Sequence, residues 1–169
     1  PADVFASANP QTMSDARSAV RAPKPVARNR LQIAVPEGNP AGVTGLADFA
    51  EDALTLAACA PAVPCGAAAV AAFDAAGIAP RLDTYGNDVK AVLTAVRLGE
   101  VDAGLVYRTD VRAAADEVDG IDIPRAPANE YPIAVLKEAP NPAGARAFVS
   151  FVRSGRGRQV LREAGFELP

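Results

Sequence analysis

Short apolar runs alternate with helical segments over most of this chain, and each run ends in a turn rich in small residues, proline or asparagine. Three such runs lie at 54–58, 80–85 and 103–107, and their length and composition are typical of buried strands. Helical patterns follow the first two, over about 65–76 and 88–98. Strands that alternate with helices in this way favour an α/β fold with a largely parallel sheet.

Further elements are expected on both sides of this central part. A helix is predicted from Pro10 to about Val20, because Asn9 can cap it and proline fits the first helical position. Residues 21–28 contain two prolines and are expected to form an extended connection. The other predicted elements are strands at 3–6, 30–35, 121–123 and 133–136, and helices at 46–52, after a capping Asp110, at 142–152 and at 156–164.

The composition narrows the classes of function. The 169 residues are 50% hydrophobic, mostly alanine and valine, which suits one domain or two small lobes with a buried core. The net charge of −3 supplies no basic surface for nucleic acid, so no nucleic-acid partner is expected. Histidine is absent, which removes the commonest general base and transition-metal ligand. We therefore expect no enzyme, no cofactor and no directly bound metal cation.

The turn from Ala60 to Ala67 is the first candidate site. A strand ends there, the chain passes two prolines, and a helix opens on Cys65 and Gly66. Free N–H groups in the first turn of a helix, together with the helix dipole, favour a bound anion. The competing interpretation is an ordinary connection between a strand and a helix.

Two further segments point to the same edge of the predicted sheet. The turn 85–90 opens a second helix, capped by Asn87 or Asp88, and Tyr107 ends the strand 103–107. In a parallel sheet these positions lie at the carboxyl ends of the strands, where ligands tend to bind. A tyrosine hydroxyl there could donate a hydrogen bond to an anion without adding charge. Simple helix capping and a half-buried core tyrosine are the alternatives.

The two cysteines, Cys59 and Cys65, flank the first turn. An oxidised pair would brace that turn, and we favour a disulfide there, which an extracytoplasmic setting permits. The alternative is two buried free thiols that act as small hydrophobic residues. Nucleophilic chemistry is the weakest interpretation, since no histidine can serve as the base.

Several motifs along the whole chain, taken in order, resemble the periplasmic molybdate-binding proteins of ABC transporters. The chain opens on PADVFASA at residues 1–8, which is similar to that family's signature. Later segments agree as well: VPEGNP at 35–40, VPCG at 63–66, DVK at 88–90, DAGLVY at 102–107 and YPIAVLK at 131–137.

The resemblance implies a type II periplasmic-binding fold, an α/β architecture whose two lobes hold an oxyanion in a cleft. Lobe two would run over 34–131, and residues 1–33 and 132–169 would form part of lobe one. Carried over by position, the ligand-binding donors of lobe two are the N–H groups of Cys65 and Val89 and the hydroxyl of Tyr107. The family's other donors are two serine hydroxyls that lie upstream of the PADVF signature, so the first lobe is expected to be incomplete.

The resemblance also implies partners and location. The ligand would be molybdate or tungstate, the partner the membrane permease of an ABC importer, and the protein an extracytoplasmic monomer, periplasmic or lipid-anchored. Two alternatives remain: an effector-sensing domain of a transcription regulator with the same fold, and a receptor for another small oxyanion.

Overall fold

The computed structural model describes all residues from 1 to 169, and the chain divides into two compact units. The first unit comprises Pro1–Asn29 and Asn129–Pro169, and the second comprises Arg30–Ala128. From the sequence, lobe one was expected to comprise residues 1–33 and 132–169. The first unit instead ends at residue 29 and resumes at residue 129. The first limit falls inside strand β2 (Val20–Pro36), and the second falls at the start of strand β7 (Ala128–Leu136), directly after a loop.

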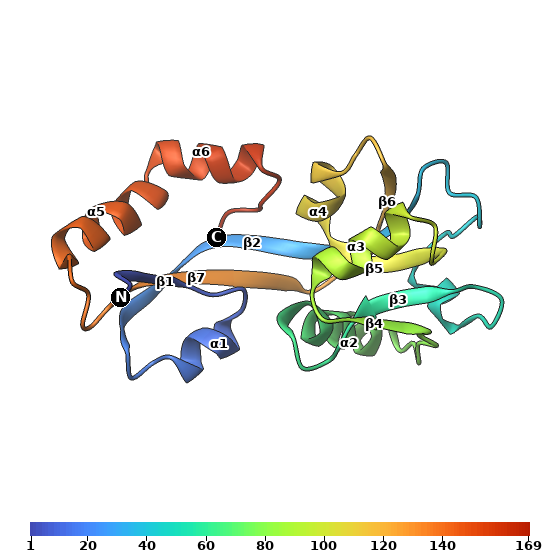
Figure 1. The fold of residues 1–169 in the computed structure, drawn as a ribbon, viewed down its shortest axis with the longest axis horizontal. Coiled ribbons are helices and arrows are strands. Elements are labelled where there is room, and N and C mark those ends of the chain that lie inside the picture. The colour runs from blue at the N-terminus through green and yellow to red at the C-terminus, as the bar shows by residue number, and fades with distance from the viewer. The chain divides into compact units, whose positions relative to one another are not determined.

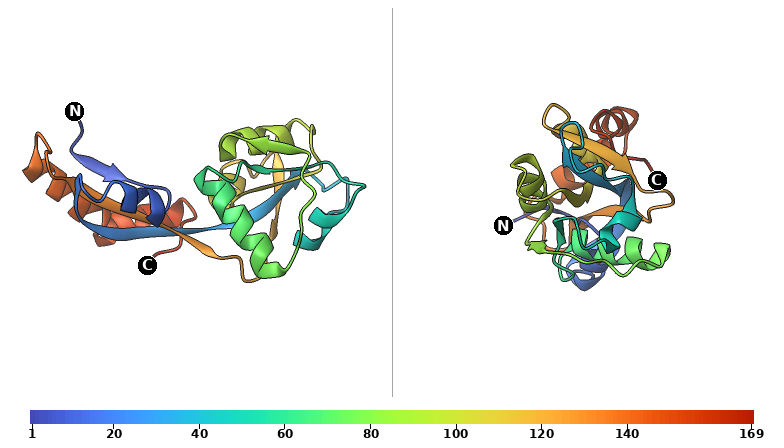
Figure 2. Two further views of the ribbon diagram at one scale, coloured as in Figure 1. Left: turned by 90° about the horizontal axis from the view of Figure 1, so that it is seen from below. Right: turned by 90° about the vertical axis from the view of Figure 1, so that its right-hand side faces the viewer.

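The strands of the first unit follow the order β1-β7-β2, with β1 (Val4–Ala6) antiparallel to β7. Helix α1 lies on one face of these strands, and the consecutive helices α5 and α6 lie on the other (Figures 1 and 2). A small apolar cluster of Met13, Val20 and Ala134 joins α1 to the strands. The helices of this unit are α1 (Pro10–Asp15), α5 (Pro142–Val152) and α6 (Gly155–Glu163).

Two predictions in the first unit are wrong. The helix expected to reach Val20 ends at Asp15, and residues 21–28 belong to β2 instead of forming a connection. Pro23 and Pro25 are tolerated in this strand because they are exposed at its free side, in the part of β2 that ends the β1-β7-β2 order. An exposed edge position needs no N–H for the sheet, which proline lacks.

The second unit is built on the strand order β6-β2-β5-β3-β4. Strand β3 pairs in parallel with both β4 and β5, whereas β2 is antiparallel to β5 and β6. The sheet is therefore mixed, and the expectation of a largely parallel sheet is correct only for the two pairings of β3, with β4 and with β5. The new strands are β3 (Leu56–Cys59), β4 (Thr84–Gly86), β5 (Ala103–Tyr107) and β6 (Val118–Asp122).

Helices α2 and α3 cover opposite faces of this sheet (Figures 1 and 2). The chain steps outward from β3 to β4 and then back past β3 to β5. Right-handed crossovers in opposite directions place their helices on opposite faces. The helical elements of this unit are the 3-10 turn η1 (Leu46–Ala50), α2 (Pro64–Ala76), α3 (Val89–Arg97) and α4 (Arg108–Ala113).

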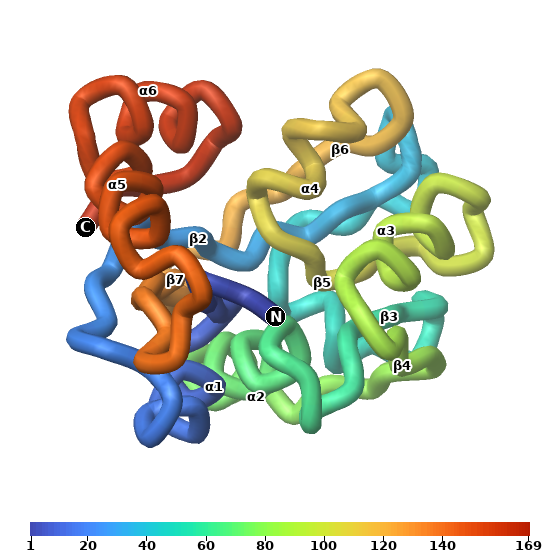
Figure 3. The backbone as a smooth tube through the Cα atoms, turned by 60° about the vertical axis from the view of Figure 1, so that its left-hand side comes forward, coloured from blue at the N-terminus to red at the C-terminus, as the bar shows by residue number.

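The main core lies between this sheet and its helices. Phe49 and Phe73 meet with ring centroids 5.6 Å apart, and Gly104 lets α3 pack directly on β5. A Cβ atom at Gly104 would lie 2.7 Å from a methyl carbon of Val92, closer than any normal contact. The tube in Figure 3 traces the path from β5 into α4. No helix of the chain has the length and apolar character that a membrane span requires.

Candidate functional site

Three strands of the second unit end side by side. Cys59, the last residue of β3, lies opposite Gly86, the last residue of β4, and Ala57 lies opposite Gly104 of β5. Since all three strands run in the same direction, the segments that follow them leave from one edge of the sheet. These segments hold Cys65 in the first turn of α2, Val89 in the first turn of α3, and Tyr107 at the end of β5.

This edge contains a topological switch point. The helix that follows β3 covers one face of the sheet, and the helix that follows the neighbouring strand β4 covers the other (Figure 2). In open α/β sheets, ligands bind in the crevice at the carboxyl edge where helices diverge in this way. The first turns of α2 and α3 are therefore the backbone segments nearest to such a crevice.

The amino end of α2 is open. Its N-cap residue, Val63, has an extended backbone and no capping side chain, and Pro64 takes the first helical position. The first hydrogen bond of the helix runs from the Ala67 N–H to the Val63 carbonyl at 2.9 Å. The N–H groups of Cys65 and Gly66 therefore have no acceptor within the protein. They are free donors at the positive end of the helix dipole.

Gly66 explains how this helix end comes so close to the sheet. A Cβ atom at this position would lie 1.8 Å from the carbonyl oxygen of Ala60 and 2.8 Å from that of Cys59. No side chain can be accommodated there without moving backbone. The same turn is closed by a hydrogen bond of 3.0 Å from the Val63 N–H to the Ala60 carbonyl.

The structure joins Cys59 and Cys65 in a disulfide, with their Cα atoms 5.6 Å apart. The bond connects the end of β3 to the second residue of α2. Both side chains are buried, with 2% of Cys59 and 6% of Cys65 exposed. The first turn of α2 is thus held to the sheet covalently.

The amino end of α3 is only partly capped. The Asp88 carboxylate accepts a hydrogen bond of 2.9 Å from the Ala91 N–H, which leaves the N–H groups of Val89 and Lys90 without a protein acceptor. Gly86 allows the close approach of this turn, because a Cβ atom there would lie 2.7 Å from a methyl carbon of Val92. Of the two caps considered from the sequence, the structure uses Asp88.

Tyr107 is buried, with 6% of its surface exposed, and faces Leu31 of β2 across the antiparallel pairing. Its N–H donates a hydrogen bond of 3.0 Å to the carboxylate of Asp110. The helix α4 starts at Arg108, so Asp110 is its third residue and not the N-cap that the sequence predicted. The chain enters the helix directly from the strand, and the carboxylate reaches back to the strand's last N–H.

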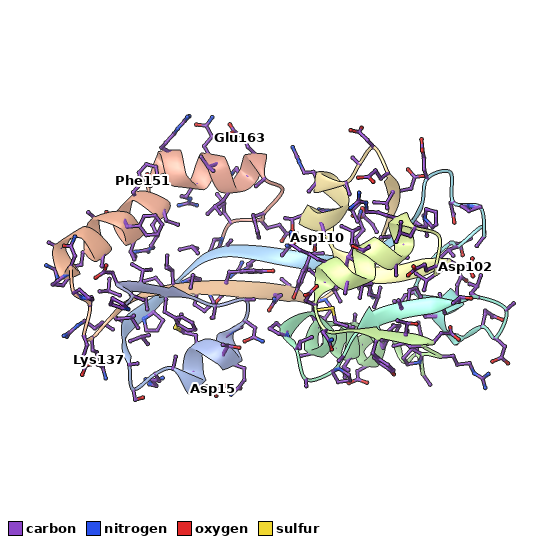
Figure 4. The ribbon with its side chains drawn as sticks, in the orientation of Figure 1. Asp15, Asp102, Asp110, Lys137, Phe151 and Glu163 are labelled. Atoms are coloured by element: carbon purple, nitrogen blue, oxygen red, sulfur yellow. A yellow bond between two sulfur atoms is a disulfide. The ribbon has the colours of Figure 1, made fainter.

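Near this edge, the carboxyl group of Asp110, which is labelled in Figure 4, has a pKa that differs from its ordinary value. Burial raises its pKa above the ordinary value, and the Tyr107 N–H and the positive charge of Lys90 partly oppose that rise. Lys90, in the first turn of α3, thus interacts electrostatically with a carboxylate of α4. A cation and an anion at this edge offset each other, and neutral N–H donors remain.

Sequence reasoning overlooked two residues of this arrangement. Asp110 was taken as a helix cap and Gly66 as one small residue among several, yet the first holds the Tyr107 backbone and the second lets α2 approach β3. An aspartate three residues after a strand's last tyrosine was the available signal for Asp110. For Gly66, the signal was a glycine directly after a proline and a cysteine that could pair.

Together these features describe an α/β unit in which two helix ends with free N–H groups and a buried tyrosine lie at one sheet edge. The chain belongs to the family of bacterial extracellular solute-binding proteins, whose model matches residues 1–167. This family membership agrees with the type II periplasmic-binding fold that the motifs implied.

Known proteins resemble the chain in sequence and in fold. It is 39% identical over 173 residues to the molybdate-binding protein ModA of Mycobacterium tuberculosis, covering 99% of this chain and 66% of that protein. The periplasmic molybdate-binding protein of Azotobacter vinelandii superposes with a TM-score of 0.79 at 19% identity, covering 99% of this chain and 78% of that structure. The sulfate-binding protein SubI of M. tuberculosis reaches 0.82 at 15% identity, covering 99% and 69%. The last two likenesses concern the fold.

Proposed function

We propose that this chain is part of an extracytoplasmic receptor that captures molybdate for an ABC importer. The observation that supports this most directly is the pair of open helix ends at one sheet edge, in a chain 39% identical to a molybdate-binding protein. The proposed donors to the anion are the N–H groups of Cys65 and Val89 and the hydroxyl of Tyr107. Tungstate has the same charge and nearly the same size and is proposed to bind as well.

Neutral donors suit a receptor that must release its ligand. A bound dianion interacts with aligned N–H dipoles and helix ends, which stabilise charge where water is excluded. No lysine or arginine is assigned to the ligand, so no strong ion pair has to be broken on release.

The membrane permease of the importer is the proposed protein partner, and the receptor is proposed to act as a monomer. The relative from M. tuberculosis is half as long again as the matched segment, since the chain spans 66% of it. Activity, ligand and partner are therefore properties that we propose for the whole protein. Periplasmic or lipid-anchored placement is part of the same proposal.

Calorimetry on the full-length protein tests this function. Molybdate should bind with a one-to-one stoichiometry, and tungstate should displace it. Sulfate should displace molybdate poorly, because sulfate is the smaller anion and fixed spacing between the donors selects for anion size. Tight binding of sulfate with weak binding of molybdate would replace this proposal with a sulfate receptor, whose fold the chain also shares.

A further inference from the structure

Helix α2 differs from the other long helices in how its amino end is held. In each of the other helices of nine or more residues, a capping side chain accepts one backbone N–H of the first turn. Those caps are Asp88 for α3, Asn141 for α5 and Ser154 for α6. Helix α2 has 13 residues, a valine at its N-cap and no side-chain cap.

A different device holds the end of α2. Cys65 is bonded to Cys59, and Cys59 is fixed within the sheet by its pairing with Gly86 of β4. The next residue, Ala60, continues that pairing through a hydrogen bond of 2.8 Å from its N–H to the Gly86 carbonyl. The disulfide therefore ties the first turn of α2 to the paired end of β3.

We propose that the Cys59–Cys65 disulfide replaces a capping side chain, fixing the first turn of α2 while leaving its N–H groups open to the anion. This inference rests on the proposed function, because it assigns a purpose to the open donors. A side-chain cap at residue 63 would accept the N–H of the third helical residue, Gly66, as the caps of the other three long helices do. It would then occupy one of the two N–H groups that are open to the anion at this helix end. A covalent tie through the Cys65 side chain stabilises the same turn and uses neither N–H group. Cys59 is then a positioning residue that acts through Cys65.

The first test removes the tie in the full-length protein. The variant that combines Cys59→Ala with Cys65→Ala keeps the backbone donor of residue 65 and loses the bond. Its dissociation constant for molybdate should rise by roughly three- to tenfold, as expected for a partly lost hydrogen bond to a charged group. Amide exchange at Ala67, whose N–H forms the first hydrogen bond of α2, should become faster. The control is Asn141→Ala, which removes the cap of α5 and should lower Tm without changing the affinity for molybdate.

The second test adds a side-chain cap. Val63→Thr keeps the shape of the side chain and supplies a hydroxyl at the N-cap of α2. Introduced into the double alanine variant, it should slow amide exchange at Ala67 again. It should not fully restore the affinity for molybdate, because the new hydroxyl occupies the Gly66 N–H, one of the two N–H groups otherwise open to the anion. A variant that regained wild-type affinity along with slow exchange would show that a cap serves as well as the disulfide, and would overturn the proposal.

The two readouts separate this inference from the proposed function. If the wild-type protein does not bind molybdate, the proposed function fails, and amide exchange still reports whether the disulfide holds α2. Unchanged exchange in the double alanine variant overturns the inference in either case. Faster exchange with an unchanged dissociation constant also overturns it, because the tie would then have no effect on the site.

Discussion

The Tyr107 N–H and the Asp110 carboxylate are joined by a hydrogen bond of 3.0 Å that links the end of β5 to the first turn of α4. The tyrosine that we assign to the anion is therefore held by a carboxyl group whose pKa is raised by burial. Lys90 of α3 is also close enough to influence that group. One residue of α4 thus couples the backbone of β5 to the charge at the start of α3.

Replacing Asp110 by asparagine should alter how stability depends on pH. The raised pKa means that the folded state favours the protonated acid, so this contribution is fully present below the ordinary value of 3.8 and is lost as pH rises through the raised one. Asp110→Asn keeps an acceptor for the Tyr107 N–H and removes the charge. At pH 7 it should raise the free energy of unfolding, because the folded state no longer holds a partly buried charge.

Urea titrations at pH 3 and pH 7 measure this effect, and the gain should disappear at the lower pH. The matched variant Asp110→Ala leaves the Tyr107 N–H without its acceptor and should lose about 1 kcal/mol at pH 7. A gain of equal size at both pH values would show that the charge of Asp110 is not its cause.

Gly66→Ala should disrupt the start of α2, because the new methyl carbon would lie 1.8 Å from the Ala60 carbonyl oxygen. The expected cost is about 1–3 kcal/mol of stability or more, as for overpacking in a rigid core. Gly155→Ala is the control, since a Cβ atom there meets nothing within 4 Å. Thermal unfolding should show a lower Tm only for the first variant, and equal Tm values would contradict the close approach.

The cap of α3 can be separated from its charge. Asp88→Ala removes the acceptor of the Ala91 N–H and should cost about 1 kcal/mol of stability, whereas Asp88→Asn keeps a good cap and should be nearly neutral. Because the first turn of α3 carries the Val89 donor, the alanine variant should also bind molybdate more weakly than the asparagine variant. Chemical unfolding and calorimetry on both proteins measure these differences, and identical behaviour would remove Asp88 from the support of the site.

Local sequence signals predicted best the elements whose ends are marked by a capping residue, a glycine or a proline. The strand 103–107 and the helix 142–152 match the structure at both ends, and the helix expected at 65–76 begins one residue earlier. Gly77 ends that helix with a left-handed backbone, φ 68°, as its C-cap role requires. The spacing of apolar residues, the capping residues and the glycines all act over a few neighbouring residues. A single sequence is therefore enough to predict the elements that they define.

Strand direction and edge position are not local properties. The sequence of residues 30–35 does not indicate that this strand runs antiparallel to β5. The two prolines before it favoured a connection over a strand, although an exposed edge strand tolerates proline. The strand expected at 80–85 is found at Thr84–Gly86. Directly before it, the Asp83 carboxylate accepts a hydrogen bond of 2.8 Å from the Leu56 N–H, a contact between segments that are distant in the sequence.

Cys65 and Val89 lie in turns after strands and Tyr107 ends one, and the sequence predicted that these positions share one sheet edge. Their role in binding an anion stays a prediction. The hydrogen-bond pairing of β3 with β4 and with β5 shows that these three strands are parallel neighbours. The roles of Gly66 and Asp110 depend on contacts with Ala60 and the Tyr107 backbone, which only a folded chain brings together.

The most direct test of the central claim is the molybdate affinity of Tyr107→Phe, measured by calorimetry on the full-length protein. Loss of one hydrogen bond to a charged ligand should weaken binding by about 1–3 kcal/mol, with little change in fold. The control Tyr85→Phe alters a tyrosine that is 55% exposed and should leave the affinity unchanged. An unchanged dissociation constant for Tyr107→Phe would contradict the assignment of the anion to this edge.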